Sequence, residues 1–282
     1  INKLSGTTNI QHAIYADTDS VYFTLSTLVD KYFKGKDTTE IVGLLDRVVK
    51  DKIEPELKRI NQQICDENNN YTNKMNFDRE AIANKGIFVS KKRYLMRVHD
   101  NEGVRYAEPK MKIMGLSIIK SDTPEVCRNK IKASLGIILD GNNNEMIKYI
   151  DEFRKEWNKL PPEEFAISKS ANKINKYLSK KTVYVKGTPI QSKAAIIHNM
   201  LVEKYGLDVA DIEEGNKLKY LLLKEPNPTG DKVIGFNNFL PEDFRLHEFV
   251  DYNVMFDKAF ISPLSDILDS IGWDTENKAT LF

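Results

Sequence analysis

Two aspartates separated by one residue, Asp17 and Asp19, are the side chains of this sequence best suited to chemistry. They lie in the run YADTDS, between two apolar, β-branched stretches at residues 9–16 and 20–26 that predict a β-hairpin. Mg²⁺ takes oxygen ligands from few carboxylates and completes its shell with water and phosphate, so a carboxylate pair at a hairpin tip predicts a magnesium site. Such a site could serve two-metal phosphoryl transfer. An ordinary surface turn is the alternative interpretation, because isolated D-x-D patterns are common.

A cluster of cations beside an aromatic residue follows about 70 residues later, at Lys91, Lys92, Arg93 and Tyr94, on a strand predicted over residues 92–99. Clustered cations of this kind suit nucleic-acid phosphates. The alternative is a basic strand edge that deters aggregation. Shortly before the cluster, Glu80 is a second candidate carboxylate, which could instead pair with Arg79 or with a lysine.

A third group of candidate residues lies where a helix is expected to begin, after Asp122 and with Pro124 in its first turn. Hydroxyl groups and a lysine at a helix start can bind phosphate, and Lys120, Ser121 and Thr123 have these properties. The alternative is an ordinary helix N-cap formed by Asp122 or Thr123.

The elements that must position these residues change in character along the chain. Strands are predicted at residues 74–83, 86–90 and 92–99, with a tight turn at 100–103, and a long amphipathic helix at residues 39–64 is kinked or divided by Pro55. Helices dominate after residue 122 and are predicted from there to about residue 140, at 145–160 and at 192–205. We therefore predict an α+β fold with a mixed first domain, residues 1–118, and a mainly helical second domain, residues 119–282.

Composition narrows the classes of protein that remain. The net charge is +1, but residues 74–132 carry 14 Lys and Arg against 7 Asp and Glu, and residues 206–282 carry 7 against 15. Basic segments with an acidic tail suit a partner that is a polyanion, although solvated lysine-rich faces explain the pattern equally well. No apolar run approaches the roughly 20 residues of a membrane span. Two isolated cysteines predict a reducing, cytoplasmic location.

The run YADTDSVY at residues 15–22 resembles motif C of the family B DNA polymerases, with Ala16 in place of the usual glycine. The resemblance implies that Asp19 binds the metal directly, that Asp17 is a weaker or outer-shell ligand, and that Thr18 lies at the nucleotide. It also implies DNA as substrate, deoxynucleotides and two Mg²⁺ ions. The first domain would then be the carboxy-terminal part of the palm, an antiparallel sheet with helices, and the second domain the thumb.

The order of the other candidates also resembles this family, whose K-K-x-Y motif follows motif C. By this resemblance Lys91, Lys92, Arg93 and Tyr94 contact the primer–template, and Glu80 is an outer-shell carboxylate. Lys120, Ser121 and Thr123 would contact DNA at the palm-to-thumb junction, where the similarity is strongest to T-even-type bacteriophage polymerases. In a viral protein the location would be the host cytoplasm. The last five residues, 278–282, resemble the start of a tail that binds a sliding clamp.

Motif A, which supplies the other metal-binding aspartate, and motif B are both missing from the sequence. The chain begins at Ile1 and is predicted to be a split subunit or a fragment, inactive until a second part brings the exonuclease, fingers and motif A. Two other interpretations remain open. One is a non-catalytic DNA-binding or processivity module derived from a thumb, and the other is a metal-dependent nuclease.

Overall fold

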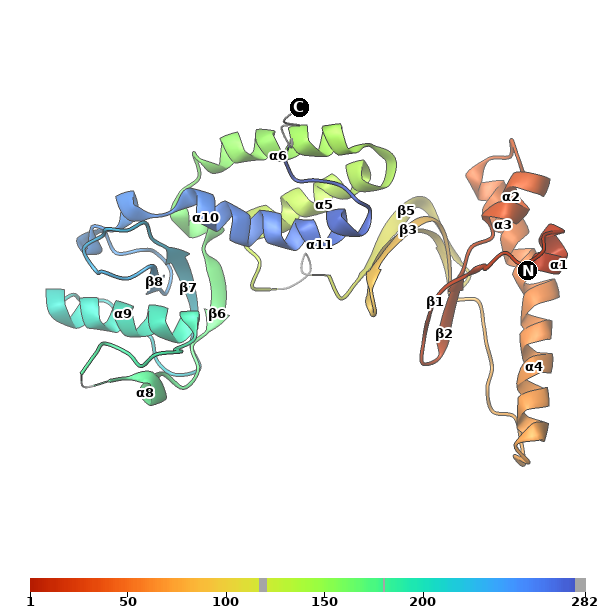
Figure 1. Cartoon of the computed structure of the whole chain (residues 1–282), viewed down its shortest axis with the longest axis horizontal. Helices are drawn as coiled ribbons and strands as arrows, with labels where there is room; N and C mark the ends of the chain where they lie inside the picture. The colour runs from red at the N-terminus through yellow and green to blue at the C-terminus, as the bar shows by residue number, and fades with distance from the viewer. Residues whose placement is uncertain (117–120, 180, 277–282) are drawn as a thin grey trace. The chain divides into compact units, whose positions relative to one another are not determined.

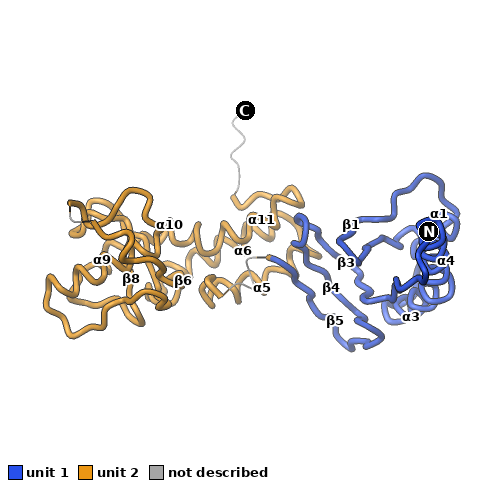
Figure 2. Tube along the Cα trace, turned by 90° about the horizontal axis from the view of Figure 1, so that it is seen from below, with its two compact units in different colours: residues 1–115 blue, residues 116–282 orange. Residues whose placement is uncertain are grey.

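The computed structural model describes residues 1–116, 121–179 and 181–276, and the chain divides into two compact units, residues 1–115 and 116–282 (Figure 2). Helices and antiparallel sheets occur in both units, which confirms the α+β class. The predicted boundary after residue 118 lies outside the described residues, and the assignment of palm and thumb stays a prediction. Within the described part of the chain, no helix is long and apolar enough to cross a membrane.

The first unit combines a two-stranded hairpin, a three-stranded antiparallel sheet of order β3-β4-β5, and helices (Figure 1). Its elements are α1 (Asn2–Ser5), β1 (Ala13–Asp17), β2 (Ser20–Phe23), α2 (Ser26–Tyr32), α3 (Thr38–Val48), the π-helical η1 (Val49–Ile53), α4 (Glu54–Glu67), β3 (Ala81–Ser90), β4 (Arg93–Asn101) and β5 (Val104–Met114). The predicted hairpin is present, but its second strand is shorter than expected because Ser26 already begins α2.

The long amphipathic helix is present as α3, η1 and α4 in direct succession. Asp37 starts it, because its side chain accepts a hydrogen bond from the Glu40 amide at 2.9 Å. Pro55 lies in the first turn of α4, immediately after the π-helical turn, where its missing amide is tolerated. Leu28, Val42, Leu45 and Ile82 then form a buried core between helices and sheet.

One prediction in the first unit was wrong: β3 is a single strand over residues 81–90, and residues 74–80 are not a strand. Gly86 lies inside β3 and does not interrupt it. Glycine suits this position because a Cβ atom there would lie 3.0 Å from the Met96 side chain of the neighbouring strand. The preceding segment is held by side-chain bonds instead, since Arg79 donates to Asp46 of α3 at 2.9 Å and pairs with Asp100 of β4.

The second unit is mainly helical and also contains a three-stranded antiparallel sheet of order β6-β7-β8 (Figure 1). Its elements are α5 (Glu125–Asp140), α6 (Asn143–Trp157), α7 (Pro162–Phe165), β6 (Ile167–Ser170), α8 (Ile174–Tyr177), α9 (Ile190–Tyr205), β7 (Lys217–Leu222), β8 (Val233–Phe236), the 3₁₀ turns η3 (Glu242–Phe244) and η4 (His247–Phe249), α10 (Tyr252–Phe256), the π-helical η5 (Asp257–Ile261) and α11 (Ser262–Ser270). Strands β6 and β8 were not expected, because runs of four residues carry little periodicity.

Aromatic side chains form much of the core of the second unit. Trp157 stacks on Phe165 with ring centroids 4.4 Å apart, and Phe153 packs edge-on against Phe260 at 4.7 Å. The indole of Trp157 donates to the Tyr252 carbonyl at 2.9 Å, which satisfies the one polar atom of this buried ring. The close approach of β8 to α9 needs Gly235, where a Cβ atom would lie 2.8 Å from the Ala194 carbonyl oxygen.

Candidate active site

The two aspartates lie at the tip of the β1–β2 hairpin, where Asp17 pairs with Ser20 in the antiparallel register. Thr18 has a positive φ of 49°, and the Asp19 amide donates to the Asp17 carbonyl at 2.6 Å, so the turn is very tight. The Thr18 hydroxyl donates to the Asp17 carboxylate at 3.2 Å. Asp19 is exposed, whereas the Asp17 side chain is 22% exposed. Asp19 is therefore the more accessible of the two carboxylates.

A cluster of four aromatic rings, which we call the aromatic support, packs this hairpin against strands β3 and β4. Its members are Tyr15 and Tyr22 of the hairpin and Phe88 and Tyr94 of the β3–β4 pair, with ring centroids 5.4 to 6.3 Å apart. The hydroxyls of Tyr22 and Tyr94 are hydrogen-bonded at 2.9 Å. Burial, and next this hydrogen bond, raise the pKa of Tyr22, so its phenol is protonated at neutral pH. The aromatic support thus fixes the hairpin on the three-stranded sheet.

The lysine turn, Lys91–Lys92, connects β3 to β4 and lies against the same hairpin. The Lys92 amide donates to the Tyr15 hydroxyl at 2.8 Å, and the Lys92 ammonium lies 3.7 Å from the Asp17 carboxylate. Two motifs that are some 70 residues apart in the sequence therefore meet in space. The strand predicted over residues 92–99 is present as β4, which starts one residue later, at Arg93.

The four residues of the predicted DNA-binding cluster differ in exposure. Lys91 and Lys92 are exposed, and Arg93 is half-buried at the start of β4 and has interaction partners. Tyr94 is only 7% exposed, because its ring belongs to the aromatic support. Tyr94 therefore positions the turn and the hairpin, and the two exposed lysines carry the charge that a phosphate could meet.

Glu80 forms an ion pair with Lys112 of β5, which is the lysine-paired alternative that the sequence left open. Its charge reaches the hairpin, since it adds to the rise in the pKa of Tyr22, after larger contributions from burial and from Tyr94. Among the described residues, however, no three His, Cys, Asp or Glu side chains converge on one possible cation position. Asp17 and Asp19 fit the one or two carboxylates that Mg²⁺ commonly takes from a protein, and the remaining ligands would come from elsewhere.

The residues predicted to bind DNA at the start of α5 are only partly accessible. Ser121 is exposed, Thr123 is 9% exposed and has interaction partners, and Lys120 lies outside the described residues. The helix begins at Glu125, with Pro124 as its N-cap and no side-chain capping bond. The alternative interpretation, an ordinary N-cap formed by Asp122 or Thr123, is therefore wrong, because Pro124 occupies the cap position.

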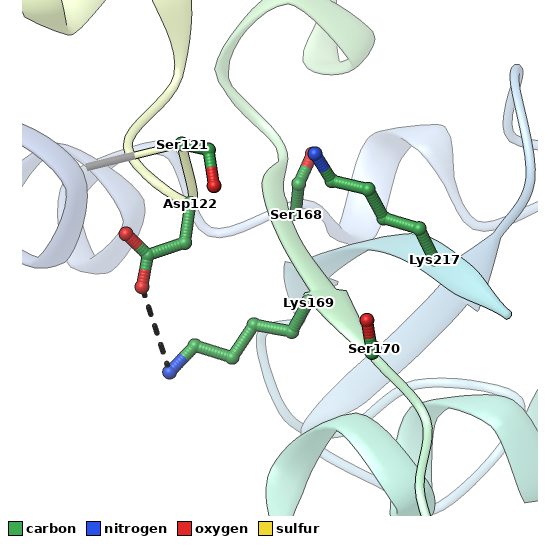
Figure 3. A pocket seen from close by; sticks show the side chains of 6 residues that line it. All are labelled: Ser121, Asp122, Ser168, Lys169, Ser170 and Lys217. Carbon is green, nitrogen blue, oxygen red and sulfur yellow. Dashed lines mark ion pairs between the residues drawn. The ribbon is translucent and has the colours of Figure 1, made fainter. Parts of the chain in front are cut away.

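Ser121 and Asp122 instead line an open hollow of about 530 Å³ in the second unit, which we call the serine–lysine hollow (Figure 3). The other lining residues come from β6 and β7: Ser168, Lys169, Ser170 and Lys217. Lys169 lies 3.9 Å from the Asp122 carboxylate, as the dashed line in Figure 3 marks. Two lysines against one aspartate, with three serine hydroxyls, suit an anion such as a phosphate group.

Sequence reasoning missed Ser168, Ser170 and Lys217. The alternation of serine and lysine in ISKS was the available indication of a phosphate-binding surface. It could not be interpreted without knowing which strand pairs with this segment. In the structure Ser170 lies opposite Lys217 in the register of β6 and β7. The predicted clamp-binding tail, residues 278–282, lies outside the described residues.

The chain is similar to DNA polymerases along its whole length. It is 34% identical to the DNA-directed DNA polymerase of Enterobacteria phage T4 over an alignment of 295 residues, and 36% identical to that of Escherichia phage RB69 over 297. These alignments include 100% of this chain and 32% and 33% of the two relatives. A DNA polymerase of Thermococcus kodakarensis is 24% identical over 94% of the chain. No family model matches the chain. This chain spans about a third of the length of the two bacteriophage relatives.

Proposed function

Because this chain is a relative of the family B DNA polymerases along its whole length, as its two motifs predicted, we propose that it forms part of the active site of a DNA-directed DNA polymerase. The observation that carries the proposal is the meeting of the aspartate hairpin with the lysine turn, through the bond from the Lys92 amide to the Tyr15 hydroxyl. Carboxylates that bind a cation and lysines that bind phosphate are then held on one rigid support.

In this proposal Asp19 is the direct metal ligand, since it is exposed, and Asp17 is the weaker one, since it also accepts from Thr18 and lies beside Lys92. Bound Mg²⁺ would supply charge neutralisation of the phosphates during nucleotidyl transfer. In the same proposal Thr18, in the turn between the two aspartates, contacts the incoming nucleotide. Glu80 stays an outer carboxylate, held by Lys112.

The chain supplies two carboxylates where a two-metal site needs more, so the proposal includes a second part that completes the site. That part would carry motif A, the fingers and the exonuclease, and it corresponds to the two thirds of the bacteriophage relatives that this chain does not span. The proposal also includes binding of a sliding clamp by residues 278–282.

Primer–template DNA would contact the chain through its backbone, because a copying enzyme must accept every sequence. The lysine turn is one proposed contact. The serine–lysine hollow is a second, in which Ser121 keeps its predicted role and Lys169 and Lys217 supply charge.

Asp19→Asn tests the proposal in the chain combined with the two thirds that complete it. We expect synthesis to fall by at least about 10³-fold, because the substituted side chain no longer provides an anionic metal ligand, while primer–template affinity stays within about twofold. Asp30→Asn, which changes an exposed aspartate on α2, is the matched control and should leave synthesis unchanged. Primer extension on a labelled template and fluorescence anisotropy measure the two quantities.

The rival function, a non-catalytic DNA-binding module, predicts a different result. Synthesis by the combined parts would then be unaffected by Asp19→Asn, and the charge change would alter DNA affinity at most. Extension of a primer by this chain alone, with Mg²⁺ and deoxynucleotides, would contradict the proposed need for a second part.

A further inference from the structure

Gly115, the residue that directly follows β5, packs against the lysine turn more closely than any other residue type could. Its φ is +63°, and a Cβ atom built on it would lie 2.2 Å from the carbonyl oxygen of Lys92. A side chain at this position could enter only if the backbone of Lys92 moved. The neighbouring pair Tyr94 and Met114 in the β4–β5 register fixes the two strands at this point, so the strands cannot easily separate.

Lys92 is thereby held on both sides of its peptide backbone. Its carbonyl faces Gly115, and its amide donates to the Tyr15 hydroxyl of the hairpin at 2.8 Å. Lys92 itself has a positive φ of 61°, which lysine rarely adopts, so the turn depends on these contacts for its conformation. A shift of the Lys92 backbone would move both its ammonium, near Asp17, and the tyrosine that supports the aspartates.

We propose that Gly115 is a positioning residue. It holds the Lys92 backbone where the Lys92 amide can donate to the Tyr15 hydroxyl, and so couples the end of β5 to the hairpin that carries Asp17 and Asp19. The predicted loss of DNA affinity rests on the proposed function, whereas the predicted change in the turn does not. Gly115 touches neither DNA nor metal in this proposal and acts through Lys92.

Gly103 provides a matched control in the same unit. It lies in the β4–β5 turn with a φ of +85°, and a Cβ atom there would meet nothing within 4 Å. Alanine at Gly103 and at Gly115 therefore suffers the same kind of left-handed backbone strain. Only alanine at Gly115 also collides with Lys92.

The experiment compares Gly115→Ala and Gly103→Ala in the full chain, labelled selectively with ¹⁵N-lysine. We expect Gly115→Ala to shift the Lys92 amide resonance, as its bond to Tyr15 lengthens. Primer–template affinity should fall by about tenfold, the size of one lost charge-assisted contact. Gly103→Ala should do neither. A Lys92 resonance that stays in place in Gly115→Ala, or that moves equally in Gly103→Ala, would overturn the proposal.

Tyr15→Phe tests the same coupling from its other end. Because it removes only one hydroxyl, it serves as the test if Gly115→Ala does not fold. With ¹⁵N-glycine as well as ¹⁵N-lysine labels, the amides of Lys92 and Gly115 should both shift and that of Gly103 should not. A shift of Lys92 without Gly115 would refute the coupling. If the resonances move as expected but DNA affinity does not change, the positioning role stands and the proposed DNA contact at the lysine turn fails.

Discussion

Thr18 and Lys92 both adopt the left-handed backbone conformation, with φ of 49° and 61°, at the two turns that form the candidate site. This conformation costs an ordinary residue about 1 to 2 kcal/mol relative to glycine, and it is least favourable for a β-branched residue such as threonine. Each side chain contacts the Asp17 carboxylate, Thr18 by a hydrogen bond and Lys92 by its charge. Such a strained backbone persists where the surrounding contacts hold it in place.

Lys92→Gly should therefore stabilise the chain and weaken its proposed binding to primer–template DNA. We expect the free energy of unfolding to rise by about 1 kcal/mol, because the turn loses its strain, and primer–template affinity to fall because a cation is lost. Urea denaturation and fluorescence anisotropy measure these effects. Glu102→Gly relieves a similar φ of 52° in the β4–β5 turn, so it should stabilise the chain without changing DNA affinity. An unstable Lys92→Gly chain, or one that binds DNA normally, contradicts this account.

At the scale of elements, one arginine joins helix α3 to the three-stranded sheet. The Arg79 side chain is 7% exposed and pairs with Asp46 of α3 and with Asp100 of β4, whose side chain is 1% exposed. Burial by itself would raise the pKa of Asp46, but Lys50 and Arg79 outweigh it and lower the pKa. The Asp46 carboxylate is thus a charged partner of the buried Arg79 guanidinium.

Removal of Arg79 should leave Asp46 and Asp100 paired with the more exposed cations Lys50 and Arg105. We expect Arg79→Met to lower the free energy of unfolding by about 3 kcal/mol, the lower end of the cost of breaking a buried ion pair. Arg59→Met, which removes an exposed arginine paired with Glu56 on α4, should leave the unfolding midpoint nearly unchanged. Chemical denaturation followed by circular dichroism gives both values. Equal effects of the two substitutions would show that Arg79 does not join the helix to the sheet in this way.

At the scale of the whole molecule, the net charge of +1 is the sum of separate basic and acidic segments. The proposed binding to DNA would therefore depend on where the cations lie. The lysine turn belongs to the first unit and the serine–lysine hollow to the second. If both meet phosphates, each neutralised phosphate releases counterions and adds to the salt dependence of binding.

Lys92→Met and Lys217→Met should each reduce the slope of log affinity against log salt concentration by about 0.9, the value for one phosphate contact on duplex DNA. Titration of a labelled primer–template at several salt concentrations measures the slope. Lys148→Met, on the exposed side of α6, should leave the slope unchanged. A slope for Lys217→Met that equals that of the unsubstituted chain would exclude the serine–lysine hollow from the DNA contact.

Features that depend on residues near one another in the chain could be predicted from the sequence alone. These are the β-hairpin around Asp17 and Asp19, the long amphipathic helix of α3 and α4, and the α+β class. Hydrophobic periodicity and turn residues determine such elements locally, and the run YADTDS identified the aspartates. The two motifs also indicated the relatives.

Only the tertiary structure decided what each candidate touches. It brought Lys92 to Tyr15, buried Tyr94 in the aromatic support, paired Glu80 with Lys112, and placed Gly115 against Lys92. The pairs Lys92–Tyr15, Glu80–Lys112 and Gly115–Lys92 lie 77, 32 and 23 residues apart in the chain. No periodic pattern records such contacts, because they follow from strand register and from the packing of separate elements against one another. The sequence alone thus identified the carboxylates of the candidate site, and the fold determined which side chains support them.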